Sequence, residues 1–108
     1  MTLTIQLARL GRVATLRLHG RVDRDAAELL EGAFADAASA APEAVELDFA
    51  DVDYINSTGI ALIVGLLARA RADRIAVRAL GLTDHYRHIF EITRLCDFIE
   101  IVQPATAP

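Results

Sequence analysis

The sequence lacks several features that define large classes of protein. It has one cysteine, Cys96, so no internal disulfide can form, which fits a reducing compartment. Its longest apolar run, Ile60 to Ala68, is far shorter than the ~20 residues that cross a bilayer. The first residues do not resemble a secretory signal, because Thr4, Gln6 and Arg9 interrupt the apolar positions. We therefore expect a cytoplasmic protein with no direct membrane insertion.

Acidic residues outnumber basic ones, and this balance together with the motif content limits the classes of partner and cofactor that we expect. With 11 basic and 15 acidic residues the net charge is -4, whereas nucleic acid rewards a clustered basic face, so no nucleic-acid partner is expected. No glycine-rich phosphate-binding motif occurs, so we expect no nucleotide cofactor. His85 and His88 are better explained by an exposed helix face than by a metal site, which needs three or four converging ligands. We expect Cys96 to be a small buried apolar residue.

The remaining composition is that of one globular domain. Apolar residues make up 54% of the 108 positions and charged residues 24%, a balance that supports a packed core and argues against disorder. A chain of this length forms one core but not two. We therefore predict a single domain over residues 1–108, with a frayed tail over 103–108.

Two patterns of alternation open the chain. Apolar residues alternate with polar ones from Leu3 to Leu7 and again from Ala14 to Leu18, which predicts two half-buried strands. The Leu10-Gly11-Arg12 break between them suits a hairpin, so these strands should be antiparallel neighbours.

The rest of the chain alternates between helical and strand patterns. The first helix has Asp25 and Glu28 in a capping-box-like arrangement, and Thr83 is a candidate cap for a later helix. The predicted elements are helix 26–37, strand 45–49, helix 58–72, strand 75–79, helix 83–94 and a short strand 99–102.

This order, β-β-α-β-α-β-α-(β), predicts an α/β fold. Strands separated by helices pair in parallel through right-handed crossovers. We predict a single mixed sheet of about four to five strands, an N-terminal hairpin followed by parallel crossovers. About three helices should pack mainly on one face of this sheet.

Ser57 lies where the third strand should end and the second helix should begin, and four interpretations compete for it. As a plain helix cap, its oxygen would accept a hydrogen bond from a free N–H group. The Asn56-Ser57-Thr58 triplet also matches a glycosylation sequon, which we attribute to chance. A serine nucleophile would need a glycine-flanked elbow and a base, and Ile55 breaks that pattern.

The fourth interpretation is a phosphate acceptor. The start of a helix favours negative charge because its N–H groups are free and its dipole is positive there. Phosphorylation adds about -1.5 to -2 charges and would change what docks on that surface without unfolding it. The small neighbours Thr58 and Gly59 leave the Ser57 hydroxyl accessible to a kinase.

The second helix carries no polar residue from Ile60 to Ala68, although a helix on one face of a sheet normally keeps a polar stripe. Two explanations are open. Neighbouring helices bury its second face, or an exposed apolar patch beside Ser57 forms a partner site.

These segments together resemble the STAS domain of sulfate transporters and anti-sigma factor antagonists. "LDFADVDYINSTGIALIVGLLARAR" is similar to the family's signature, "LRLHGRVDRDAAELL" to its second strand and first helix, and "GLTDHYRHIFEITRLCDFIEIV" to its third helix and following strand. The resemblance covers residues 3–102 and implies a STAS-like fold.

The resemblance implies a regulatory, non-enzymatic bacterial protein, an anti-sigma factor antagonist. Ser57 falls on the serine that a partner kinase phosphorylates in these antagonists, and Thr58 and Gly59 match the residues after it. Asp23 falls on an acidic residue near the kinase-facing surface, although by its chemistry it is equally a second candidate cap for the first helix. We expect Asp23 and residues Asn56 to Gly59 to contact the partner. The implied partners are an anti-sigma factor that is also a serine kinase, which the unphosphorylated form binds, and a phosphatase. We expect a monomer or weak dimer.

The sequence departs from the antagonists at two places. Asn56 stands where they commonly carry Asp, and residues 103–108 have neither the length nor the pattern of their further C-terminal helix. The alternative within the family is a STAS subunit that docks on the ATPase or permease of a membrane transporter or lipid-transport complex. A small hydrolase using Ser57 is the rival from another class.

Overall fold

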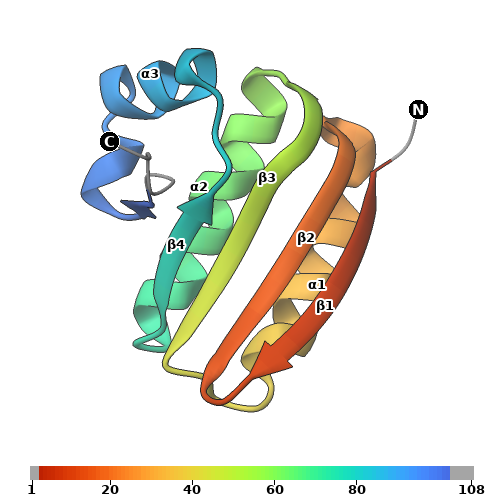
Figure 1. Cartoon of the computed structure of the whole chain (residues 1–108), viewed down its shortest axis with the longest axis vertical. Coiled ribbons are helices and arrows are strands. Elements are labelled where there is room, and N and C mark those ends of the chain that lie inside the picture. Colours follow the sequence, from red (N-terminus) through yellow and green to blue (C-terminus); the bar gives the residue numbers. More distant parts are fainter. Residues whose placement is uncertain (1–2, 103–108) are drawn as a thin grey trace, which may run out of the picture.

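The computed structural model describes residues 3–102, which form one five-stranded sheet with its strands in the order β1-β2-β3-β4-β5 (Figure 1). The predicted tail over 103–108 lies outside the described residues. The strands are β1 (Thr4–Leu10), β2 (Val13–Val22), β3 (Ala44–Ile55), β4 (Ala76–Leu80) and β5 (Glu100–Ile101). The helices are α1 (Ala27–Ala38), α2 (Ser57–Ala72) and α3 (Asp84–Ile92), with short 3-10 turns η1 (Arg24–Ala26) and η2 (Leu95–Asp97).

The N-terminal hairpin is as predicted. β1 and β2 pair antiparallel in one unbroken register from Thr4 opposite His19 to Leu10 opposite Val13. The two-residue turn needs a backbone conformation that glycine adopts without strain, and Gly11 has a φ of 59°.

All later strands pair in parallel, which confirms the mixed sheet. The crossovers run through α1 between β2 and β3 and through α2 between β3 and β4. Both helices lie behind the sheet in the view of Figure 1, while α3 lies at the end of the sheet beside β4. The predicted packing of helices mainly on one face is therefore confirmed.

Alternation along β2 explains which face the helices cover. Ala14, Leu16 and Leu18 are almost wholly buried, whereas Arg17 and His19 between and beyond them are exposed. Burial of each large apolar side chain contributes about 1.5–3 kcal/mol. Because the buried residues of β2 all lie on one face, the core lies between the sheet and its two crossover helices.

The alternation from Val45 to Phe49 covers only the first part of the third strand, which ends just before Ser57, as predicted. β3 continues past Phe49 to Ile55, and its last residue pairs with Val22 at the end of β2. Irregular register between Arg17 and Arg21 lets the two strands stay paired where the simple alternation is lost. Sheet pairing therefore overrides the weak strand propensity of the acidic residues in this segment.

The predicted capping box of the first helix is wrong. Asp25 lies inside η1, a 3-10 turn that precedes α1, and α1 itself has no side-chain cap. The cap of η1 is Asp23, whose Oδ1 accepts a hydrogen bond from the Asp25 backbone N–H at 3.1 Å. The extra turn shifts the start of the helix, so the spacing from Asp25 to Glu28 has no capping role.

The predicted burial of Cys96 is also wrong. Leu95, its neighbour in η2, fills the buried position, and Cys96 points to solvent. A 3-10 turn has three residues per turn, so two adjacent residues cannot both face the core.

The third helix holds the end of β3 in place. Its predicted cap is confirmed, because the Thr83 Oγ1 accepts from the Tyr86 N–H at 3.3 Å. Phe90 is fully buried and meets Phe49 edge-on, with ring centroids 5.8 Å apart. The Ile55 N–H donates to the Tyr86 hydroxyl oxygen at 3.0 Å, so α3 satisfies the last backbone donor of β3.

We predict that Tyr86→Phe destabilises the protein by about 1 kcal/mol, because the half-buried Ile55 N–H loses its acceptor. Urea denaturation followed by circular dichroism measures this. Tyr54→Phe is the matched control, since Tyr54 is 40% exposed and its hydroxyl makes no hydrogen bond within residues 3–102. Equal stability of the two variants would contradict the assigned role of Tyr86.

Candidate functional site

The candidate site lies where β2 and β3 end side by side. Ile55 pairs with Val22, and the Asn56 N–H donates to the Val22 carbonyl at 3.3 Å. This pairing brings the segment after β2 to the start of α2. A hollow of ≈ 290 Å³ lies between them, lined by Asp23, Arg24, Asp25, Asn56 and Thr58. The structure thus brings together Asp23 and the Asn56–Gly59 segment.

The cap of α2 is Asn56 rather than Ser57. Asn56 has an extended backbone, and its Oδ1 accepts from the Gly59 N–H at 2.9 Å. Ser57 is the first residue of the helix. The plain-cap interpretation of Ser57 is therefore wrong, because the capping bond reaches from Asn56 to the residue three positions later.

The Ser57 side chain is consequently free. It is exposed, and within residues 3–102 its hydroxyl makes no hydrogen bond. Thr58 beside it is exposed too. The first N–H groups of α2 point out of the helix here and give this end a partial positive charge. The helix dipole therefore favours a negatively charged group on Ser57.

Gly59 has a packing role beneath these two residues. It is buried, and a Cβ at this position would lie 2.0 Å from the Val22 carbonyl oxygen and 2.9 Å from the Val22 carbon. The first turn of α2 therefore sits directly on the backbone at the end of β2. Contact of Gly59 with a partner stays a prediction.

Three residues at this edge were not singled out from the sequence. Arg21 forms an ion pair with Asp23 at 3.6 Å, and its guanidinium lies 4.6 Å from the centre of the Tyr54 ring. Arg24 and Thr58 both line the hollow. Arg21 and Tyr54 meet because they are opposite each other in the β2–β3 register, which no local pattern reveals.

The outward face of α2 remains open to solvent, so neighbouring helices do not bury it. Ile63, Leu66 and Leu67 face the core. On the other side, Val64 is 47% exposed. The exposed apolar residues of this face, which we call the α2 stripe, are Ala61, Val64, Gly65 and Ala68. An apolar surface therefore starts one turn after Ser57.

We predict that Asn56→Ala lowers the free energy of unfolding by about 1 kcal/mol, because the Gly59 N–H loses its acceptor. Asn56→Asp should keep or slightly raise stability, since a carboxylate caps equally well and suits the helix dipole. Thermal and urea denaturation measure both. A loss of stability in Asn56→Asp as large as in Asn56→Ala would contradict the cap.

The histidines do not join the site. His19 is exposed on the sheet face opposite the helices, and His85 and His88 are exposed on α3. Over residues 3–102 no group of three or more His, Cys, Asp or Glu side chains is placed to hold a metal ion. In the same range no helix combines the length and the hydropathy needed to span a bilayer.

Comparison with known families and sequences gives consistent matches. The family model described as "Mlab, STAS domain" matches residues 5–103. The anti-sigma-B factor antagonist of Listeria monocytogenes is 37% identical over 57 residues, 53% of this chain and 50% of that protein. The chain thus spans about half the length of the curated relatives it matches.

Solved structures share the whole fold. An anti-sigma factor antagonist from Mycobacterium paratuberculosis superposes with a TM-score of 0.78 and 18% identity, over 96% of this chain and 88% of that one. The Bacillus cell fate determinant SpoIIAA in its phosphorylated form gives a TM-score of 0.64 and 21% identity, over 93% and 92%. At these identities the likeness shows the fold, which confirms the predicted STAS-like architecture.

Proposed function

Because the chain belongs to the STAS domain family, we propose that it is an anti-sigma factor antagonist, a regulatory protein rather than an enzyme. In this proposal the unphosphorylated form binds an anti-sigma factor that is also a serine kinase. Phosphorylation of Ser57 releases it, and a phosphatase restores the binding form. Such a cycle consumes ATP and belongs in the cytoplasm.

The observation that carries the proposal is the position of Ser57. It is the first residue of α2, exposed, and free of hydrogen bonds within the described range. Because Asn56 takes the capping role, phosphorylation of Ser57 removes no bond that the fold needs. A kinase can therefore modify it in the folded protein.

The surroundings of Ser57 explain how a phosphate could act as a switch. The α2 stripe begins at Ala61, one turn away, and Asp23 lies across the hollow at the end of β2. A partner that covers this surface must remove water from the Ser57 hydroxyl, or from the phosphate when Ser57 is phosphorylated. A serine hydroxyl is tolerated there, whereas a dianion is not unless the partner supplies a positive charge.

The relatives support the same function. The curated relative with 37% identity carries the name anti-sigma-B factor antagonist, and SpoIIAA was solved in a phosphorylated form. Both are statements about those proteins. They favour a phosphorylated antagonist over the hydrolase, because no histidine lines the hollow beside Asn56 and Thr58.

A second candidate function follows from Asn56. It caps α2 without adding a negative charge beside the acceptor, so the same surface would suit a subunit whose Ser57 is never phosphorylated. In that case the protein docks permanently on an ATPase or permease of a transporter or lipid-transport complex.

The identity of the bound protein separates the two candidates. Immobilised Ser57→Ala and Ser57→Asp proteins are incubated with extract of the native cells, and retained proteins are identified by mass spectrometry. We expect Ser57→Ala alone to retain a protein that transfers one phosphate from ATP to Ser57 of the wild type. Retention of a transporter ATPase or permease by both variants would overturn the proposal in favour of the second candidate.

A further inference from the structure

The C-terminal half of α2 borders a groove that the proposed switch does not use. One hollow of ≈ 260 Å³ is lined by Val64, Leu67, Ala68, Arg71, Leu95 and Phe98. A second, of ≈ 320 Å³, shares Leu67, Arg71 and Phe98 with it and extends toward the start of β4. We call the two together the α2–η2 groove.

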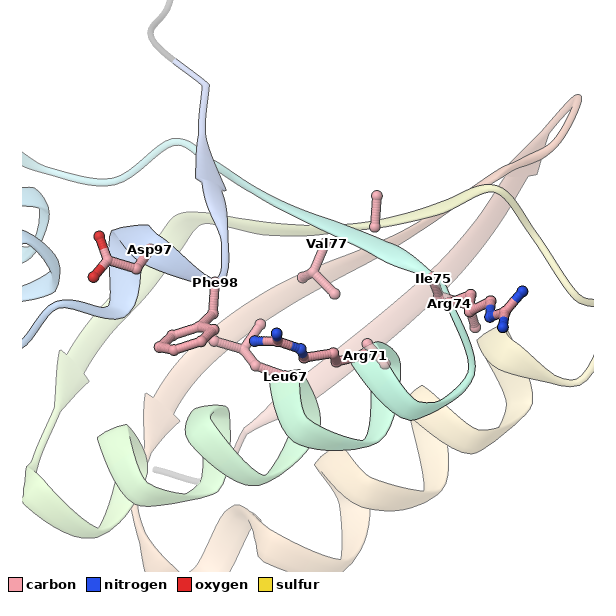
Figure 2. A pocket seen from close by; sticks show the side chains of 9 residues that line it. Leu67, Arg71, Arg74, Ile75, Val77, Asp97 and Phe98 are labelled. Atoms are coloured by element: carbon pink, nitrogen blue, oxygen red, sulfur yellow. The ribbon is translucent and has the colours of Figure 1, made fainter.

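Phe98 is the most conspicuous side chain of this groove. It is 56% exposed although its neighbours Leu95 and Leu67 are buried. The Arg71 guanidinium lies 5.7 Å from the centre of its ring, and Figure 2 shows the Arg71 side chain extending toward Phe98 beside Leu67. Aromatic residues and arginine are both enriched at protein interfaces relative to the rest of the protein surface.

The charge around the groove identifies the kind of partner. Arg71 and Arg74 line it, and neither takes part in an ion pair within residues 3–102. The one carboxylate on the rim, Asp97, is already paired with Arg94 at 3.0 Å. The groove is therefore positive in a chain whose net charge is -4, and it complements an acidic segment.

The shape of the adjoining surface favours a helix. The α2 stripe runs from Ala61 to Ala68 and meets the groove at Val64 and Ala68. At Gly65 an added Cβ would have no atom within 4 Å, so this face of α2 is open. Small residues along a helix let a second helix approach closely.

From the exposed Phe98, the positive rim and the open α2 stripe, we propose that the α2–η2 groove binds an acidic amphipathic helix. This helix belongs to the same partner that covers Ser57, so the inference rests on the proposed function. The interface then extends along the whole of α2, and only its Ser57 end responds to phosphate. The other end holds the partner by apolar contact and charge.

Photo-crosslinking in the native cells tests the groove directly, because the crosslinked protein is identified afterwards by mass spectrometry. The full chain carries p-benzoylphenylalanine in place of Phe98 in one variant and of Ala61 in another, both with Ser57 intact. We expect both positions to crosslink the same protein. We expect the peptide joined at position 98 to be acidic and to carry apolar residues three or four positions apart, as on one face of a helix.

A matched pair of charge reversals completes the test. Arg71→Glu should reduce the crosslink at position 98 at least ten-fold, whereas Arg69→Glu, an exposed residue of α2 outside the groove, should change it less than two-fold. Crosslinks at 98 to another copy of this chain, to its own residues 103–108, to a different protein from that at 61, or to none would overturn the inference. Phosphate on Ser57 is read separately, so failure of the switch and failure of the groove are distinguishable.

Discussion

Ser57→Asp is expected to weaken binding of the partner retained by Ser57→Ala about 100-fold, which corresponds to about 2.7 kcal/mol. The exposed hydroxyl at the start of α2 would become a carboxylate inside the contact surface. Burial of that charge without a counter-charge costs more free energy than the new contact contributes to binding. Phosphoserine, with its larger charge, should weaken binding at least as much.

Isothermal titration calorimetry with the purified partner measures this loss. Gln6→Glu is the control, because it adds one negative charge to an exposed residue of β1, away from α2. Ser57→Asp should also unfold at the same temperature as the wild type or slightly higher, since an acidic residue suits the first turn of a helix. Equal affinity of Ser57→Asp and wild type, or equal loss in Gln6→Glu, would contradict a local switch.

Gly59→Ala is expected to destabilise the protein by about 3 kcal/mol, the largest effect on stability that we predict. Its Cβ would lie 2.0 Å from the Val22 carbonyl oxygen, and backbone cannot move aside as a flexible side chain can. Either α2 or the end of β2 must shift. Because Asn56 and Ser57 are fixed by this contact, the shift would also displace the candidate site.

Gly65→Ala in the same helix is the matched control. Its Cβ meets nothing within 4 Å, and alanine is favoured over glycine in a helix by about 0.5–1 kcal/mol, so this variant should be more stable than the wild type. Urea denaturation of both variants gives the two differences. Destabilisation of Gly59→Ala no larger than about 1 kcal/mol would mean that α2 does not pack on Val22 as described.

The strands and helices were predictable where the spacing of apolar residues keeps one period throughout the element. The alternation of Ala14, Leu16 and Leu18 and the Gly11 turn define the hairpin, because side-chain period and turn chemistry are local properties. The alternation of the third strand stops at Phe49, and its continuation to Ile55 depends on pairing with β2. The start of η1 at Arg24, capped by Asp23, likewise depends on where β2 ends, at Val22.

The candidate site was predictable in its residues but not in their roles. The Asn56-Ser57-Thr58 triplet contains three good caps, and only the backbone geometry assigns the bond to Asn56 and leaves Ser57 free. Arg21, Tyr54 and Tyr86 reach this edge from other elements, through strand register and through α3. Contacts between residues this far apart in the chain cannot be predicted from the local spacing of residue types.

The most direct test of the proposed switch is the intact mass of the protein purified from its native cells, with and without phosphatase, followed by mapping of the modified residue. We expect a phosphatase-sensitive gain of one phosphate on Ser57, with none on Thr58. Absence of phosphate under all growth conditions, or phosphate confined to another residue, would contradict the switch and favour a subunit that docks permanently through α2.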